Sequence, residues 1–324
     1  MNENLKMAIA SECRDLPLNQ LSQASQELSA RYQQVHQKQK AAKHLMATEA
    51  HRKAYVMARM PATYGVIKHV LFEMRLRRPD IVIKSLLDLG AGPGTGMWAA
   101  AEIYPELEKI TLIEQDAELI AVGKRLAGHS EHSALRGAVW ETGDLEKLSS
   151  LPPHDLAIVS YAINELSQAC LENLLLASWQ AASQALVMIE PGTPHGFELI
   201  RGMRNGLIRL GAHLVAPCPH ALQCPMAGGD WCHFAERIER TSTHRQAKGG
   251  SLGYEDEKYS YVIGSKSLSA TQQPHSRILR HPVKRSGHIH LVVCQAEGLS
   301  QRTISRRDGE LYKQARKLEW GDAV

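Results

Sequence analysis

Short apolar runs alternate with segments of helical periodicity through the middle of the chain. Each run is nearly continuous, as expected for a strand of a parallel sheet that is covered on both faces. Strands that alternate with helices predict βαβ units and hence a parallel sheet. The predicted strands are 81–89, 109–114, 155–160 and 185–190, and the predicted helices are 97–104, 115–127 and 166–184. We therefore expect an α/β, Rossmann-like core over residues 81–215.

The segment before this core, residues 1–80, lacks strand-like alternation and is predicted to be helical. Leu18, Leu21 and Leu28 recur at roughly helical spacing. Pro61 interrupts this pattern, so one helix should end just before it and another should start there.

The pattern loosens again after the core. Residues 216–257 are rich in Cys, Pro, Gly and His and predict a loop-like insertion. Beyond it, 258–263 and 288–294 have the composition of strands. We expect residues 258–324 to supply the final strands of the sheet and a basic tail, whose last helix ends near Trp320.

Composition narrows the class of protein. The chain has 324 residues, of which 44% are hydrophobic, enough for a large core. No uncharged apolar stretch is long enough for a membrane helix. The first ten residues carry an acid and lack the pattern of a leader or transit peptide. These features predict a bacterial, cytoplasmic protein.

Charge is distributed unevenly around the net value of +4. Residues 27–78 hold 11 Lys/Arg against 3 Glu, residues 79–216 hold 9 against 17 acids, and residues 276–324 hold 10 against 5. Basic ends around an acidic centre favour a polyanionic partner, with nucleic acid first. The alternative is that these charges belong to solvated helix faces.

A glycine-rich turn joins the first predicted strand to the next helix. It reads Asp88-Leu-Gly-Ala-Gly-Pro-Gly-Thr-Gly96, with Gly90, Gly92 and Gly94 at alternate positions. Glycine permits positive φ and a close approach of a ligand to the backbone. The following helix N-terminus adds a partial positive charge. The turn therefore predicts a nucleotide site.

Acidic residues further along the chain indicate which nucleotide is bound. Glu114 ends the second predicted strand, where a carboxylate can accept hydrogen bonds from both ribose hydroxyls of a nucleotide. Asp144 follows in a Gly-Asp-Leu sequence and is expected near adenine. Thr95 replaces the third glycine of the dinucleotide fingerprint. The set, with Asp88, resembles the first motif of class I methyltransferases that use S-adenosylmethionine; a related domain that has lost its cofactor is the alternative.

Polar residues also follow the strand at 155–160. Tyr161, Asn164 and Glu165 lie where a doubly wound sheet opens its ligand crevice, so they are candidates for the substrate side. The alternative is that Asn164 and Glu165 only cap the next helix. No pattern in the sequence indicates a general base, so the catalytic residues are left unassigned.

Four of the six cysteines form a candidate metal site. They are Cys218, Cys224, Cys232 and the distant Cys294. Thiolates suit tetrahedral zinc or an iron–sulfur cluster. The wide spacing lacks the paired knuckles of zinc ribbons and favours a [4Fe–4S] cluster, whereas nearby His220 and His233 keep zinc open as the alternative. Four unligated thiols are the remaining possibility.

Several segments together resemble one family, the Rsm-type methyltransferase-like proteins of the small ribosomal subunit. The resemblance covers roughly residues 55–320. It rests on the glycine loop, the cysteine block and five further runs: Met60-Pro-Ala-Thr-Tyr64, Gly229-Asp-Trp-Cys-His-Phe234, Arg237-x-Glu-Arg240, Lys248 to Tyr261, and Arg285-Ser-Gly-His-Ile-His290.

The resemblance implies a function. It implies binding to the rRNA of the small subunit during assembly and a [4Fe–4S] cluster on the four cysteines named above. We expect a monomer that joins the ribosomal particle, without a membrane. Three functions stay open: an rRNA methyltransferase, a non-catalytic RNA-binding assembly factor braced by its metal centre, and an iron or redox sensor.

Overall fold

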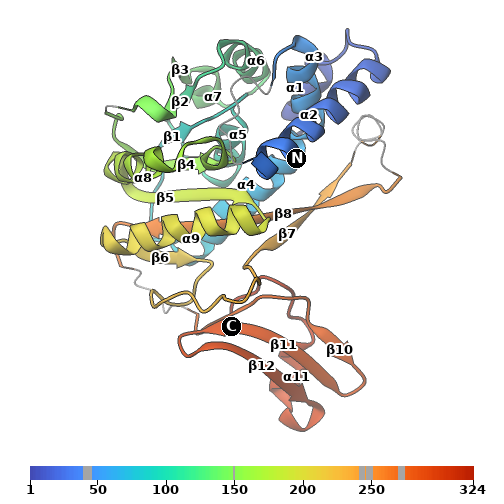
Figure 1. Ribbon diagram of the computed structural model, residues 1–324, viewed down its shortest axis with the longest axis vertical. Coiled ribbons are helices and arrows are strands. Elements are labelled where there is room, and N and C mark those ends of the chain that lie inside the picture. Colours follow the sequence, from blue (N-terminus) through green and yellow to red (C-terminus); the bar gives the residue numbers. More distant parts are fainter. Residues whose placement is uncertain (39–45, 149, 241–244, 246–250, 269–273) are drawn as a thin grey trace.

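The computed structural model describes residues 1–38, 46–148, 150–240, 245, 251–268 and 274–324. Within these residues, eight strands form one sheet in the order β3-β2-β1-β4-β5-β8-β6, and β7 pairs with the outer part of β8 (Figure 1). The strands are β1 Ser85–Leu89, β2 Lys109–Glu114, β3 Val139–Thr142, β4 His154–Ser160, β5 Ala182–Pro191, β6 His213–Ala216, β7 Phe234–Glu239 and β8 Tyr254–Ser265.

The first five strands of this sheet are parallel, and β8 runs against its neighbours. Leu87 lies beside Thr111 of β2 and Ala157 of β4 in parallel register. β8 is antiparallel to β5, β6 and β7. A reversed strand between β5 and β6 departs from the all-parallel order of dinucleotide-binding sheets. The predicted α/β, Rossmann-like fold is confirmed.

Helices cover both faces of the sheet, and the sheet divides the hydrophobic core into two layers. Leu86 packs with the cluster under α4 and α5, whereas its neighbour Leu87 packs with the cluster under α8 and α9, because successive strand residues face opposite sides. The helices are α1 Glu3–Glu12, α2 Leu18–Lys38, α3 Glu49–Ala58, α4 Met60–Arg77, α5 Thr95–Ile103, α6 Ala117–Ala127, α7 Ser133–Arg136, α8 Gln168–Ala181, α9 Pro194–Arg209 and α11 Glu310–Ala315, with short 3₁₀ turns η1 Leu145–Lys147, η2 Ile163–Glu165 and η3 Arg306–Asp308.

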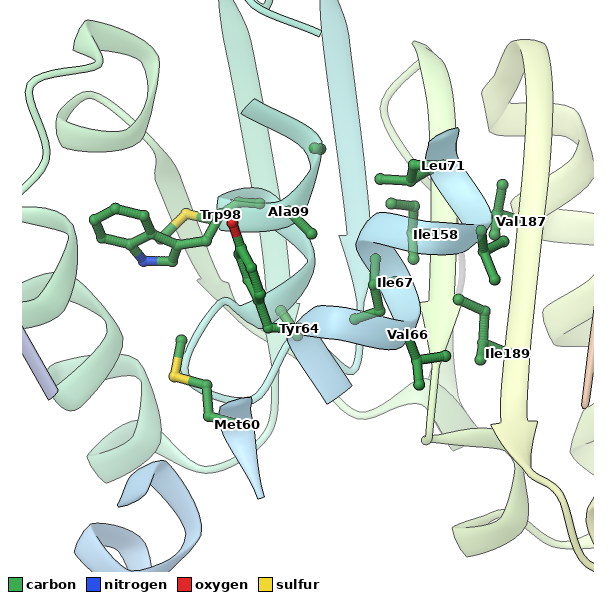
Figure 2. Close-up of a cluster of buried hydrophobic side chains, with 14 of the residues drawn as sticks. Met60, Tyr64, Val66, Ile67, Leu71, Trp98, Ala99, Ile158, Val187 and Ile189 are labelled. Carbon is green, nitrogen blue, oxygen red and sulfur yellow. The ribbon is translucent and has the colours of Figure 1, made fainter. Parts of the chain in front are cut away.

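Helix α4 fixes the N-terminal helices to the sheet. The break predicted at Pro61 is present: α3 ends at Ala58, and α4 begins at Met60 with the proline in its first turn. Figure 2 shows Ile67 of α4 directed towards Ile158 of β4. All residues of this contact are buried. The strong packing of α4 explains why the preceding helices stay close to the sheet.

The C-terminal strands form a second sheet rather than the end of the first one. Antiparallel strands β10 Val283–Arg285, β11 His288–Gln295 and β12 Gly298–Ser305 pair in that order, and β9 Ser276–Ile278 pairs with β11. The expectation that 288–294 completes the main sheet is therefore wrong. Ile289, Leu291 and Val293 instead build a separate small core with Ala315 of α11.

The tail also differs from its prediction in length. The final helix covers only Glu310–Ala315, so Trp320 lies beyond it. In the part of the chain that the structure describes, no helix combines the length and apolar character needed to cross a membrane. Residues 248–250 of the resembling run lie outside the described residues.

Candidate functional site

A pocket of about 890 Å³ opens where the parallel strands end. Loops after β1, β2, β4 and β5 line it, as expected for the ligand crevice of a doubly wound sheet. Four of the predicted cofactor residues reach its wall: Gly90, Gly92, Glu114 and Asp144. The volume lies in the range of small-molecule and cofactor sites.

The glycine loop adopts the backbone that its sequence favours. Gly90, Gly92 and Gly94 have φ of 70°, 54° and 83°, in the left-handed region that side chains avoid. A Cβ at Gly92 would meet no protein atom within 4 Å, whereas one at Gly90 would meet Ala162 at 2.6 Å. Gly94 instead caps α5 beneath the loop, next to Trp140. Gly92 is thus the glycine that presents bare backbone to the pocket.

Glu114 is held beside this loop by backbone donors. The amide of Gly92 donates to its Oε2 at 2.8 Å, and the amide of Asp116 donates to its Oε1 at 2.9 Å. Burial raises the pKa of this carboxyl above its ordinary value, and these backbone hydrogen bonds oppose the rise. Each carboxylate oxygen keeps a further acceptor site, so the side chain can still receive hydroxyl groups from a ligand.

Asp88 does not line the pocket. It is fully buried under the loop, where the backbone amide of Met97 in α5 is the polar group that favours its charged form. Burial, followed by the negative charge of Glu114, raises its pKa to about 7. A Cβ at Gly96 would lie 2.5 Å from Asp88 Oδ2, so the last glycine of the motif makes room for this carboxyl.

The substrate-side candidates line the same pocket in the loop after β4, next to Gly90, and differ in their surroundings. Tyr161 has φ of 58° although it is not a glycine, and its hydroxyl is buried without a partner. Asn164 donates its amide to Glu190 Oε2 at 2.6 Å, and it does not cap α8, whose N-cap is Ser167. Glu165 faces the pocket, and burial raises its pKa to about 8, with Glu114 and Glu190 adding to the rise.

The N-terminal helices close the pocket from the other side, which the sequence pattern did not reveal. Tyr55 and Arg59 line it, and Arg59 forms a salt bridge of 3.1 Å with Glu257 of β8. These partners are separated by 198 residues, and no local pattern indicates such a pairing. Glu190, which anchors the loop after β4 through the amide of Ile163 at 2.8 Å, was missed for the same reason.

The four candidate ligand thiols come together around a second, smaller pocket. Cys218 follows β6, Cys224 lies in the next loop, Cys232 precedes β7, and Cys294 belongs to β11 of the second sheet. All four line a cavity of about 40 Å³. Burial raises the pKa of Cys294 to about 12. The cavity lies at the junction of the two sheets.

The two histidines proposed as zinc ligands behave differently. His220 Nε2 lies 3.7 Å from Cys294 Sγ and lines the same cavity. His233 instead stacks on Trp231 with ring centroids 5.1 Å apart. Among the described residues, no three His, Cys, Asp or Glu side chains form a group that could hold a single metal ion.

Comparison with known families identifies the chain. Residues 49–324 match the family described as mitochondrial small ribosomal subunit Rsm22. The chain belongs to this family. The resemblance that the motifs predicted is therefore confirmed.

The relatives of this Rsm22-family chain are longer proteins. It is 27% identical over 328 residues to Rsm22-cox11 tandem protein 2, mitochondrial, of Schizosaccharomyces pombe, covering 83% of this chain and 42% of that protein. It is 26% identical over 299 residues to the human ribosome assembly protein METTL17, mitochondrial, covering 86% and 64%. The chain thus spans less than two thirds of either relative.

The predicted cytoplasmic location is wrong by these comparisons. The family description and the names of both relatives place them in mitochondria. That prediction had depended on the lack of a targeting pattern in ten residues, which says nothing about the compartment in which a family acts.

Among solved structures, precorrin-6y C5,15-methyltransferase of Geobacter metallireducens is 14% identical to this Rsm22-family chain with a TM-score of 0.40. The match covers 62% of this chain and 87% of that chain.

Proposed function

We propose that this chain binds S-adenosylmethionine in the large pocket and acts in assembly of a small ribosomal subunit of the mitochondrial type, on its rRNA. The observation that carries the first part is the convergence of Gly90, Gly92, Glu114 and Asp144 on one pocket of about 890 Å³. The family and the names of the relatives support the second part.

The residues fit the cofactor. Gly92 leaves its side of the pocket open, and Glu114 is fixed by two amides with acceptor sites to spare for ribose hydroxyls. Asp144 Oδ1 accepts from the amide of Glu146 at 2.9 Å, which fixes the carboxyl on the side proposed for adenine. The cofactor, when bound, supplies an electrophilic methyl group. The pocket walls would position donor and acceptor, which is the main requirement of methyl transfer.

We further propose that the four cysteines hold a [4Fe–4S] cluster, with zinc as the alternative. Their convergence on one cavity supports a metal centre. A zinc ion draws its ligands to within about 2.3 Å of one point, and no three side chains of the described residues form such a group. A four-iron cluster spreads its thiolates over the corners of a larger body, so the looser arrangement favours the cluster.

Anaerobic purification tests this centre. We expect a broad brown absorbance with matching iron and sulfide, and its loss in Cys224→Ser. Cys170→Ser is the matched control, because Cys170 lies on α8 against Ser167 and Glu146, away from the cavity. Stoichiometric zinc in a colourless protein would reject the cluster and retain the zinc alternative.

Calorimetry and label transfer separate binding from catalysis. The proposed function requires S-adenosylmethionine to bind the purified protein and labelled methyl groups to pass from it to small-subunit particles. Binding without transfer would leave the pocket as a cofactor-dependent scaffold. If no binding is detected, the methyltransferase proposal is refuted.

A second candidate, a non-catalytic RNA-binding assembly factor, is favoured by the charge of the pocket. Eight acidic side chains line it against three basic ones. Seven of the acids remain when Glu165, with its raised pKa, is left out, and Arg52 and Arg59 are already paired with acids. Such a wall suits a cationic sulfonium but repels phosphates. RNA bound elsewhere on the protein, with salt-sensitive affinity and no methylation, would fit this candidate alone.

A further inference from the structure

Two buried arginines flank the cavity that the four cysteines share. Arg204 of α9 and Arg277 of β9 are only 3% and 2% exposed, and both line the cavity. Arginine stays protonated in proteins, and a buried charge is costly unless an opposite charge or a full set of hydrogen bonds compensates it. The partners of each guanidinium therefore show what the cavity is built to hold.

Arg204 directs its guanidinium at the thiols. Its Nε donates to Cys218 Sγ at 3.2 Å, and its Nη2 donates to the carbonyls of His220 at 2.9 Å and Leu222 at 2.7 Å. These carbonyls belong to the loop between Cys218 and Cys224, so one side chain fixes the ligand loop and touches a ligand sulfur. Its Nη1 donates to Asn205 Oδ1 at 3.1 Å, so neutral acceptors satisfy the guanidinium, but no carboxylate of the described residues forms an ion pair with it.

Arg277 approaches from the second sheet, one strand away from Cys294. It lies opposite Cys294 in the β9–β11 register, and its Nε donates to the carbonyl of Pro217 at 2.9 Å. Its Nη1 contacts Glu73 at 3.1 Å, but Glu73 also pairs with Arg77 at 3.0 Å. One carboxylate thus serves two guanidiniums, and Arg277 Nη2 is buried without any partner.

Neutral acceptors, including the carbonyl of Gly321 for Arg277 Nη1, satisfy most of these donors, but Glu73 is the one carboxylate among the described residues that pairs with either guanidinium, so net positive charge remains beside the cavity. Uncharged thiols would not balance this positive charge. Four thiolates on a dipositive metal centre would, because their combined charge of minus four leaves a net charge of minus two on the centre with its ligands. Two guanidiniums match that remainder. Net charge and hydrogen bonds to the sulfurs are the levers that set the reduction potential of such a centre.

We propose that Arg204 and Arg277 compensate the charge of the four-cysteine centre and raise its reduction potential, with Arg204 also positioning the loop that carries Cys218 and Cys224. The inference rests on the proposed iron–sulfur centre. To that proposed centre the inference adds two residues outside the cysteine motif, Arg204 on α9 and Arg277 on β9.

Anaerobic potentiometric titration of the holoprotein tests this inference. Arg204→Gln and Arg277→Gln should keep a visible chromophore but become harder to reduce, by at least a tenfold change in the ratio of reduced to oxidised centre at fixed potential, which is ~59 mV for one electron. Arg209→Gln is the control, since it lies exposed on the same helix and does not line the cavity.

Charge-preserving variants separate electrostatics from folding. Arg204→Lys and Arg277→Lys should stay close to the wild-type potential even if the Gln variants lose their chromophore. An unchanged potential in coloured Gln variants, or an equal shift in the Lys variants, would overturn the inference while leaving the cluster in place. A colourless wild-type protein would instead overturn the proposed centre and this inference with it.

Discussion

Replacing Gly92 with alanine separates cofactor binding from backbone strain. Gly92 has φ of 54°, and an added Cβ would meet no protein atom within 4 Å. The methyl group would therefore clash with nothing in the protein but would project into the space proposed for the cofactor. The left-handed backbone alone should cost about 1–2 kcal/mol of stability for an L side chain.

Gly211 provides a control with the same strain and no site. It follows the end of α9 with φ of 80°, its added Cβ would also meet nothing within 4 Å, and it does not line the large pocket. Gly211→Ala should therefore lose stability by a similar amount, about 1–2 kcal/mol. Urea unfolding of both variants would measure this shared cost.

The two variants should differ in binding. Calorimetry with S-adenosylmethionine should show at least a tenfold rise in Kd for Gly92→Ala, about 1.4 kcal/mol, and an unchanged Kd for Gly211→Ala. Equal affinities in both variants and the wild type would show that no ligand approaches the loop. Equal losses in both would assign the effect to stability.

Two further changes probe the pocket. Burial raises the pKa of Glu165 to about 8 from its ordinary 4.5, so the folded protein keeps a proton that the unfolded chain has released. Wild-type stability should therefore fall as pH rises between these values. Glu165→Gln should make the fall of the urea midpoint between about pH 5 and 8 shallower, and a slope identical to that of the wild type would refute the assignment. Trp231, the neighbour of Cys232 in the chain, donates its Nε1 at 2.9 Å to the carbonyl of Gly192, which lines the large pocket. Trp231→Phe should cost about 1 kcal/mol of stability and weaken S-adenosylmethionine binding measured by calorimetry. Unaltered binding would show that the two pockets are independent.

The parallel core could be predicted because its signals are local. A buried parallel strand is a short apolar run, and a glycine-rich turn between such a run and a helix is typical of a nucleotide-binding loop. β1 and the loop containing Gly92 were therefore placed correctly from the sequence. The helix break at Pro61 was equally readable, since proline cannot continue a helix.

The second sheet could not be predicted, because the alternation of a sequence predicts a strand but does not indicate which other strand it pairs with. Residues 288–294 alternate in a way that suits either sheet, and their pairing with β9, β10 and β12 follows from tertiary structure. The same limit applies to Arg204 and Arg277. A single arginine on a helix or strand is usually solvated, and its burial against distant cysteines follows from tertiary structure alone.

The structure also separates the two basic ends that the sequence treated alike. In the N-terminal segment, Arg52 pairs with Asp116 and Lys53 with Asp15, so much of its charge is used within the fold. In the C-terminal segment, Lys284 pairs with Glu319 and Lys313 with Glu310, whereas Arg306 and Arg307 of η3 are exposed and form no ion pair with a described carboxylate.

Figure 1 shows the second sheet at the end of the molecule away from α1, α2 and α3. Phosphates repelled by the acidic pocket would be attracted here. Under the proposed function, the rRNA backbone would therefore bind outside the pocket, and a base could reach the methyl donor only by extending away from that backbone. This separation of backbone binding from the pocket is compatible with a scaffold that never methylates, and it makes label transfer, rather than RNA affinity, the measurement that decides between the two candidate functions.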